Sequence, residues 1–388
     1  MANLVLYRKY RPQTFAEIIG QEHVVQTLVN AISSGMVSHA YLFAGPRGSG
    51  KTTIARLLAK AVNCQNRKEN EFEPCNKCSS CMEIMQARSL DLLEIDAASH
   101  RGIDEIRELR DGIKFAPSKS KYKVFIIDES HQLTKEAANA LLKTLEEPPS
   151  HAIFILATTE IHKMIPTIIS RCQRFDFRKL TLPEIIKRLE IVSEKEKIKV
   201  DEAGASSSPF ANARVIEKAV LELIAVNSGG SIRDAESLLD QVLTFSGQNS
   251  KDEIKAQDIK DLLGLVELNT ISKLTDFLCQ KKASEAVNFL NEITDKGSDL
   301  QEFAKALINY LRQSLILKIS GGEVANPIIT GLTKEEFQKL QSQTANFKEE
   351  DLRRILNLFL EAENKMKYSP IPQLPLELAI IEAIELKE

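Results

Sequence analysis

The chain has 388 residues, of which 43% are hydrophobic and 27% charged, with a formal net charge of −3 and a pI of about 6.2. This length suffices for two or three domains with hydrophobic cores, and the slightly acidic balance excludes a generally basic protein that coats nucleic acid. No apolar run reaches the ~18 residues that a membrane-spanning helix needs. The N-terminus also lacks the pattern of a signal peptide, so we expect a cytoplasmic protein without structural disulfides.

The chain opens with a basic and aromatic stretch from Tyr7 to Pro12, and a short helix is predicted after it. Thr14 and Glu17 have the spacing of a capping box, and Gly20 is a typical stop. This segment either packs on the domain as an arm or covers an adenine base. In the second case Arg11 and the backbone of Ile18 and Ile19 would lie near the base. A longer amphipathic helix is expected over 21–34.

The most informative motif begins after a short apolar run at 40–44, which is typical of a buried parallel strand. It fits the phosphate-binding pattern G-x-x-x-x-G-K-[ST] at every fixed position, over Gly45, Pro46, Arg47, Gly48, Ser49, Gly50, Lys51 and Thr52. Helical spacing follows from Thr53, so the motif lies between a strand and a helix, as it must to bind phosphate. Lys51 is expected to reach the β- and γ-phosphates of a nucleotide and Thr52 to bind Mg²⁺.

Four cysteines follow the helix that the motif begins. Cys64 precedes a C-x-x-C-x-x-C run, which consists of Cys75, Cys78 and Cys81. Such short spacings let thiolates converge on one ion, so we predict a closed, structural Zn²⁺ site without chemistry of its own.

Further candidates stand where predicted strands end. A strand over 123–129 ends in Asp128 and Glu129, which we assign to Mg²⁺ binding and to general-base activation of water. A strand over 152–157 ends at Thr158 and Thr159, one of which we expect to sense the γ-phosphate or orient water. After the strand at 92–96, a turn with Ser99 and Arg101 and a helix over 103–113 fit a phosphate contact and an ordinary helix cap equally well.

From Leu180 onward the pattern is helical, which predicts a domain boundary near Arg178 and a second near Gly247. A helix is expected from Pro183 to about Ile198, and a flexible insertion over 203–214. Ser231 and Asp234 have cap spacing at another helix start, which leaves Arg233 free to face a nucleotide. Amphipathic helices are expected over 274–281, 284–293, 299–319 and 348–366.

Taken together, these motifs resemble the gamma/tau family of bacterial DNA polymerase III clamp-loader subunits. The resemblance rests on the phosphate loop, Asp128-Glu129, Thr158-Thr159, Ser170-Arg171-Cys172, the stretch 230–235, the four cysteines, and the phrases at 10–15 and 139–149. It is close over residues 1–245 and general thereafter.

The resemblance implies an AAA+ ATPase with an α/β P-loop domain and parallel sheet over 1–178, a helical lid over 179–247, and an all-α collar over 248–388. The zinc module then lies at about 64–81. The cofactors would be ATP, Mg²⁺ and Zn²⁺. By match, Thr159 or Thr158 is the first sensor and Arg233 the second, whereas Arg171 is an arginine finger for a neighbouring subunit. Ser99 and Arg101 would face DNA.

The same resemblance implies a pentameric loader of gamma/tau copies with delta and delta-prime subunits, which opens the sliding clamp and closes it on primed DNA. As part of the polymerase holoenzyme, the subunit would hydrolyse ATP without a polymerase active site of its own. The end at Glu388 further suggests loading without direct tethering of polymerase.

Three other classes of protein share some of these motifs but should differ in sequence. A remodelling motor such as a branch-migration helicase should lack the four-cysteine insert. A structural paralogue should have a degraded phosphate loop, and eukaryotic-type small loader subunits generally lack the cysteine module.

Overall fold

The computed structural model describes residues 4–68, 70–99, 112–113, 115–201, 214–246, 254, 268–295, 299–320 and 334–385. The chain divides into two compact units. One consists mainly of residues 1–201 and 224–244, and the other mainly of 215–223 and 245–388. Among the described helices, none is long and apolar enough to cross a membrane.

The first unit is built on a five-stranded parallel sheet with the strand order β2-β3-β4-β1-β5. Its strands are β1 (Ala40–Ala44), β2 (Leu92–Asp96), β3 (Lys123–Asp128), β4 (Ala152–Thr158) and β5 (Gln173–Asp176). The central strand β1 lies between β4 and β5, although both come more than a hundred residues later in the chain. The predicted α/β P-loop fold is therefore confirmed.

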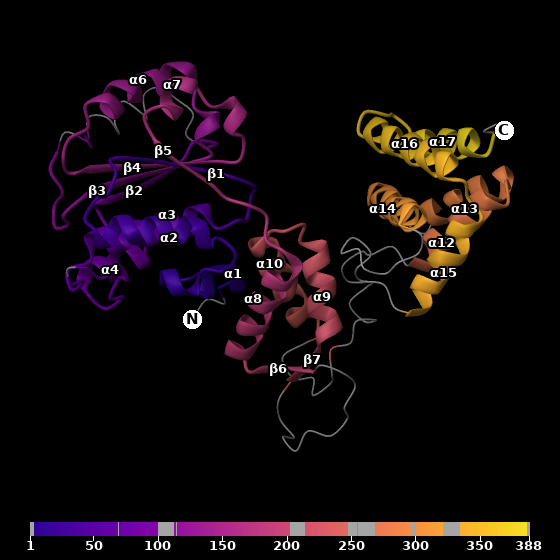
Figure 1. The fold of residues 1–388 in the computed structure, drawn as a ribbon, viewed down its shortest axis with the longest axis horizontal. Coiled ribbons are helices and arrows are strands. Elements are labelled where there is room, and N and C mark those ends of the chain that lie inside the picture. Colours follow the sequence, from indigo (N-terminus) through magenta and orange to yellow (C-terminus); the bar gives the residue numbers. More distant parts are fainter. Residues whose placement is uncertain are drawn as a thin grey trace. The chain divides into compact units, whose positions relative to one another are not determined.

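Both faces of this sheet are buried, because successive apolar side chains of each strand point to opposite sides. Tyr41 and Phe43 of β1 pack on the face that α2 (Glu22–Ser33) and α3 (Lys51–Asn63) cover. Leu42 packs on the other face, under α6 (Lys135–Glu146) and α7 (Pro166–Ile169). Figure 1 shows these two helical layers, with α4 (Ser79–Met85) beside α3. The carboxyl ends of β1, β3 and β4 thus meet at one edge, where the site lies.

Further helices and a strand complete the first unit. They are α1 (Leu6–Lys9), η1 (Phe15–Glu17), η2 (Ser130–Gln132), η3 (Ile161–Lys163), α8 (Leu182–Lys195), β6 (Ile198–Asp201) and α10 (Ile232–Phe245). The predicted cap of α10 is confirmed, since Ser231 Oγ accepts a hydrogen bond from Asp234 N at 3.2 Å. The helix expected to reach Ile198 ends at Lys195 instead, and β6 follows it.

The capping box predicted at Thr14 is wrong. Thr14 makes no side-chain cap to η1. Glu17 Oε2 does accept from Gln13 N at 2.6 Å, but the backbone N–H groups of Phe15 and Ala16 bind Glu73, far along the chain. A sequence pattern cannot reveal a cap that a distant segment supplies.

Among the residues that the structure describes, the second unit is helical apart from β7 (Arg214–Glu217) and a β-bridge between Ile216 and Ile254, and β7 leads into α9 (Lys218–Asn227). The unit then contains α12 (Leu268–Cys279), α13 (Ala283–Asp295), α14 (Leu300–Ile319), α15 (Lys334–Ala345), α16 (Glu349–Met366) and α17 (Leu374–Glu385). Four of these helices match the expected ones, whereas α15 and α17 were not predicted. The residues 103–111 of the expected helix, and 203–213 of the expected insertion, lie outside the described residues.

Candidate functional site

The phosphate loop contacts the start of α10 as well as its own strand and helix. Gly48 has φ +73°, and a Cβ atom there would overlap Ser231 Oγ. Ile232 N also donates to Gly48 O at 3.2 Å. Only glycine combines this left-handed backbone with so close an approach. The loop therefore connects the helical segment that carries Arg233 to the strand-helix motif.

Lys51 is held inside the loop, with only 6% of its surface exposed. Its ammonium donates to the carbonyl oxygens of Gly45 and Pro46, both at 2.8 Å. Burial lowers the pKa of Lys51, because an isolated charge is poorly solvated there. Arg47 is exposed, whereas Ser49 is buried and its hydroxyl donates to Pro46 O.

Two predicted magnesium ligands meet where β3 ends and α3 begins. Thr52 Oγ1 donates to Asp128 Oδ2 at 2.8 Å, although 76 residues separate them. A hydroxyl and a carboxylate are the hard oxygen donors that Mg²⁺ prefers. This pair fits a magnesium ion beside the phosphate loop. Thr53, one residue on, is half-buried in the first turn of α3.

Glu129 lies beside this pair in a backbone conformation that is unusual for a residue with a side chain, with φ +46°. Its Oε2 accepts a hydrogen bond from Thr159 Oγ1 at 2.9 Å. Thr158 is fully buried, and its Oγ1 instead lies 3.0 Å from His131 Nδ1 and accepts from Glu160 N. The structure thus separates the two threonines: only Thr159 contacts the glutamate.

The segment of residues 7–20, here called the N-terminal arm, brings positive charge toward the same region. The guanidinium of Arg233 lies 4.8 Å from the ring centre of Tyr7, within cation–π range. Burial lowers the pKa of Arg11, and the positive charges of Arg56 and Arg233 lower it further. Arg56 forms a 2.6 Å ion pair with Glu94. Sequence reasoning missed Tyr7 and Arg56, because their roles depend on contacts between distant segments.

Arg171 is engaged by its own chain. Its guanidinium forms a 2.5 Å ion pair with Glu146 and donates to Thr167 O at 2.7 Å and Ser170 Oγ at 3.2 Å. These partners belong to α6, α7 and the residue after α7, so the described contacts do not bring Arg171 to the phosphate loop.

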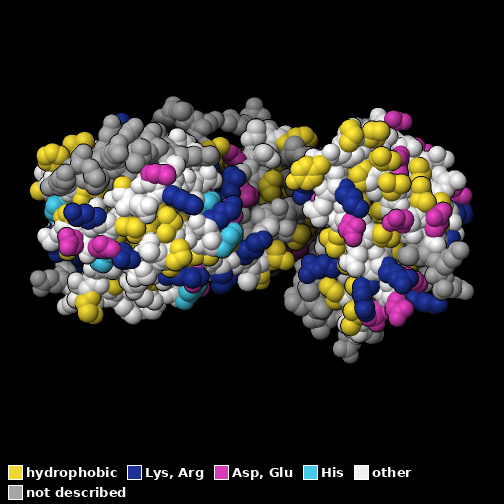
Figure 2. All heavy atoms as spheres, turned by 90° about the horizontal axis from the view of Figure 1, so that it is seen from above, with side chains coloured by type: hydrophobic (Ala, Val, Ile, Leu, Met, Phe, Trp, Pro, Cys, Tyr) yellow, Lys and Arg dark blue, Asp and Glu magenta, His cyan; other side chains and the backbone are white. Residues whose placement is uncertain are grey.

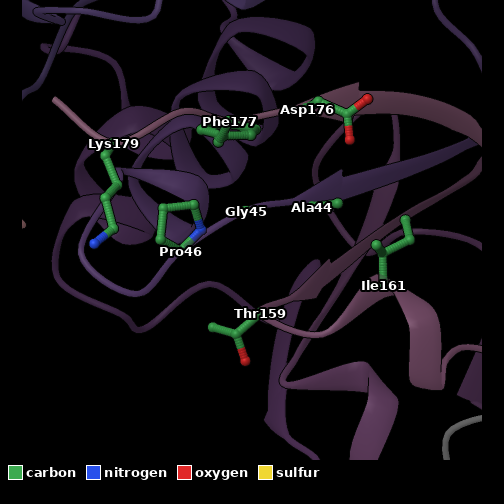
Figure 3. Close-up of a pocket in the computed structure, with 8 residues that line it drawn as sticks. All are labelled: Ala44, Gly45, Pro46, Thr159, Ile161, Asp176, Phe177 and Lys179. Atoms are coloured by element: carbon green, nitrogen blue, oxygen red, sulfur yellow. The ribbon is translucent and has the colours of Figure 1, made fainter. Parts of the chain in front are cut away.

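A pocket of about 410 Å³ adjoins the loop. It is lined by Ala44, Gly45, Pro46, Thr159, Ile161, Asp176, Phe177 and Lys179. Figure 3 shows these residues arranged around the beginning of the loop, with Lys179 on one side and Thr159 on the other. Of the predicted site residues that the structure describes, only Gly45, Pro46 and Thr159 line this pocket, so it borders the phosphate loop and is not lined by Lys51 or Asp128.

The four predicted zinc ligands do come together. The sulfur atoms of Cys64, Cys75, Cys78 and Cys81 all lie within 4.8 Å of one another. Cys75 Sγ accepts from the backbone N–H groups of Lys77 and Cys78 at 3.5 and 3.3 Å. Against the effect of burial, these hydrogen bonds lower the pKa of Cys75 to about 6. A thiolate favoured in this way is the form that binds Zn²⁺, so the cluster fits the ion.

The remaining predicted residues give less information. Ile18 and Ile19 are half-buried, and Ile18 packs on the sheet core. Ser99 Oγ donates to Asp96 Oδ2 at 3.0 Å, which closes the turn after β2. Arg101 lies outside the described residues. The DNA-facing role of both residues therefore stays a prediction.

Comparisons with known proteins decide the family. Residues 20–181 match the family model described as DNA polymerase III, delta subunit, and residues 254–388 match DNA polymerase III subunits gamma and tau domain III. The DNA polymerase III subunit gamma of Buchnera aphidicola from Acyrthosiphon pisum is 36% identical over 98% of this chain and 98% of its own length. The chain belongs to the gamma/tau family of DNA polymerase III subunits.

Longer members of the family are similar over part of their length. The subunit tau of Bacillus subtilis is 42% identical over 98% of this chain, which spans 63% of that protein. Among solved structures, the Thermotoga maritima RuvB Holliday junction branch migration motor is 18% identical with a TM-score of 0.47, over 85% of this chain and 98% of that one.

Proposed function

We propose that this protein is an ATP-hydrolysing motor subunit of a bacterial clamp loader, which loads the sliding clamp onto primed DNA for DNA polymerase III. The observation that carries the proposal is the match to a gamma subunit over nearly the whole of both chains, together with a complete set of phosphate-loop residues. The close association of Thr52, Asp128, Glu129 and Thr159 supports nucleotide hydrolysis.

In this proposal Lys51 moves its hydrogen bonds from the carbonyls of Gly45 and Pro46 to the β- and γ-phosphate oxygens, because charged acceptors bind an ammonium more strongly. Mg²⁺, held by Thr52 and Asp128, would neutralise the charge that develops on the phosphates. Glu129 accepts the proton of the attacking water. Thr159 donates to Glu129 and so fixes the direction of its carboxylate.

The two arginines act from different sides. Arg233, at the start of the helix that touches Gly48, would contact the phosphates of the nucleotide bound to its own chain. Arg171 would leave Glu146 and enter the site of a neighbouring subunit, where it stabilises transition-state charge. The arm with Arg11, Ile18 and Ile19 would border the adenine base. Zn²⁺ at the four cysteines would be structural.

The proposed partners are further gamma/tau copies, delta and delta-prime subunits, the sliding clamp and primed DNA. An exposed apolar surface on the C-terminal helices supports assembly. Ile371, Leu374, Leu378 and Ile381 are 37% to 54% exposed, and the last three follow one face of α17. Figure 2 shows hydrophobic side chains gathered on these helices. DNA contacts would be made to the phosphate backbone, near Ser99 and Arg101.

The decisive experiment compares ATP hydrolysis by the chain alone with hydrolysis in the presence of clamp, delta and delta-prime subunits and primed DNA. We expect a large rise that depends on clamp and DNA. Arg171→Ala should cut the stimulated rate by roughly 10³-fold or more while ATP binding persists. Robust hydrolysis by the lone chain, indifferent to clamp and primer and to Arg171→Ala, would contradict the proposal.

A further inference from the structure

The segment that carries the four cysteines, residues 64–81, here called the cysteine module, contacts the N-terminal arm directly. Glu73 is the main link. Its two carboxylate oxygens accept hydrogen bonds from Phe15 N at 3.0 Å and from Ala16 N at 2.9 Å. These are the first two N–H groups of η1, which a helix start leaves without partners of its own. Since Thr14 supplies no cap, Glu73 caps this helix from 57 residues away.

Two further side chains bind Gln13, which lies two residues before this helix. Asn76 Nδ2 donates to Gln13 O at 3.2 Å. Lys60 of α3, only 2% exposed, donates to Gln13 O at 3.1 Å and to Gln13 Oε1 at 2.9 Å. Polar groups buried to this degree are normally paired, and here the partner is the arm. The arm is therefore fixed at three positions, Gln13, Phe15 and Ala16.

The position of Glu73 depends in turn on the cysteines. Glu73 stands two residues before Cys75 and three before Asn76, and Cys75 N donates to Cys64 Sγ at 3.3 Å. Convergence of the four sulfurs thus determines where both contacting side chains emerge. Phe72, on the other side of Glu73, packs against the same core cluster as Phe15 and Ile18.

The contacted residues of the arm are hydrogen-bonded to Arg11 and Ile18, which are proposed to border adenine. Gln13 Nε2 donates to Arg11 O at 2.8 Å, and Ile18 N donates to Phe15 O at 3.1 Å. A shift of Gln13, Phe15 or Ala16 would therefore move Arg11 and Ile18 together.

We propose that Glu73 is a positioning residue through which the cysteine module holds the N-terminal arm in place for recognition of the adenine base. The module would then contribute to affinity for the base of the nucleotide and not for its phosphates. Removal of Zn²⁺ would loosen the same part of the arm, Gln13, Phe15 and Ala16. This inference rests on the proposed nucleotide site, and specifically on adenine lying beside the arm.

The binding test uses the whole chain and two probes, ATP and inorganic tripolyphosphate, which has no base. Glu73→Ala should weaken ATP binding about tenfold, the effect of a lost charged hydrogen bond, and leave tripolyphosphate binding unchanged. Glu73→Gln keeps one acceptor oxygen and should fall between. Glu71→Ala is the matched control, because Glu71 belongs to the same module but, among the described residues, its exposed side chain pairs only with Lys68, at 3.9 Å. Equal ATP affinities in the Glu73→Ala and Glu71→Ala proteins would overturn the inference.

Amide hydrogen exchange provides a readout that needs no nucleotide. We expect Phe15 and Ala16 to exchange faster in Glu73→Ala, in Glu73→Gln to a smaller extent, and in wild-type protein stripped of Zn²⁺ by a chelator. In all these proteins the exchange of residues 40–50 should stay unchanged. In Glu71→Ala the exchange of Phe15 and Ala16 should equal that of the wild type. If wild-type protein bound neither probe, the proposed function would fail, while exchange would still decide whether Glu73 holds the arm. Unaltered exchange at Phe15 and Ala16 would refute that link.

Discussion

Thr158 and Thr159 are adjacent in the chain, yet their hydroxyls have different surroundings. Thr159 Oγ1 donates to Glu129, whereas Thr158 Oγ1 is buried against His131 and Glu160 N. The sequence leaves the choice between them open, since either hydroxyl at a strand end suits a phosphate sensor. The packing of η2 against the end of β4 distinguishes them: Thr159 orients the Glu129 carboxylate, whereas Thr158 stabilises the end of the strand.

We therefore expect the two threonines to differ on substitution. Thr159→Val should slow hydrolysis by roughly 10- to 100-fold, part of the roughly 10²–10⁴ that a general base supplies, with ATP affinity retained. Thr158→Val should instead cost about 1–3 kcal/mol of stability, because Glu160 N loses a buried acceptor. Single-turnover hydrolysis and urea unfolding measure the two effects. Identical behaviour of the two variants would contradict this assignment.

Glu184 predicts a pH dependence at the same scale. Its carboxylate accepts two hydrogen bonds from Arg178, at 2.6 and 2.9 Å, and another from Thr181 N. The Arg178 contact, followed by those of Thr181, lowers the pKa of Glu184 to about 2 from 4.5. A pKa lowered by folding stabilises the protein above pH 4.5, and this stabilisation is lost as the pH falls toward 2.

Glu184→Gln should therefore lower the free energy of unfolding by about 1–2 kcal/mol at pH 7, a value reduced for the partial exposure of both side chains. The difference from wild type should shrink steadily below pH 4.5. Urea unfolding at pH 7, 4 and 3 measures it, and Glu194→Gln, an exposed position on the same helix, is the control. A difference that stayed constant over this range would argue against the ion pair as its source.

Among the elements, α8 and α10 are joined by a buried ion pair. Arg188 and Glu236 are 4% and 3% exposed in their side chains and lie 2.7 Å apart. Arg188 also donates to Tyr10 O at 2.5 Å, so the pair connects two helices with the N-terminal arm. Burial raises the pKa of Glu236, which only Arg188 and Arg11 counteract. Its carboxylate thus depends on the guanidinium to stay charged.

Removal of Arg188 alone should reduce the free energy of unfolding more than replacement of both Arg188 and Glu236. Arg188→Met leaves Glu236 buried and uncompensated, so we expect a loss of about 3–5 kcal/mol. The double variant Arg188→Met/Glu236→Leu should recover most of it, because apolar side chains of similar size replace the charges. Thermal unfolding of the three proteins measures the difference. A double variant as unstable as the single one would show that the charges are not the cause.

The elements also show what the sequence could predict. Strands β1 to β4, the phosphate loop and the cysteine cluster were predicted because each depends on local spacing, whereas β6 and β7 were not predicted. α17 was missed, since it has apolar residues on an exposed face as well as on its buried face and so lacks the polar face of an amphipathic helix. α15 was missed because it has few apolar residues. The cap that Glu73 gives η1, and the contacts of Arg56, Tyr7 and Arg188, join segments distant in sequence. No pattern within one segment reveals such contacts.

At the scale of the whole molecule, the apolar stripe on α17 predicts self-association or binding to related subunits. Solvent-exposed apolar residues in a row are typical of interfaces. Leu378→Ser with Ile381→Ser should weaken assembly at least tenfold without loss of the fold, because both side chains are 37% or more exposed. Light scattering of the chain with the proposed delta and delta-prime subunits measures assembly. Glu382→Ser on the same helix is the control, and a double variant that assembles as well as this control would exclude the stripe.

The place of β1 in the sheet has a consequence for synthesis. Both neighbours of this strand, β4 and β5, are encoded more than a hundred residues downstream. A nascent chain that has just emerged beyond the phosphate loop therefore has a hydrophobic central strand with two unpaired edges, and closing such distant contacts is slow. The strand that precedes the phosphate loop therefore lacks at least one of its two neighbours until about residue 176 has left the ribosome. During that time we expect the growing chain to be prone to aggregation or to depend on a chaperone.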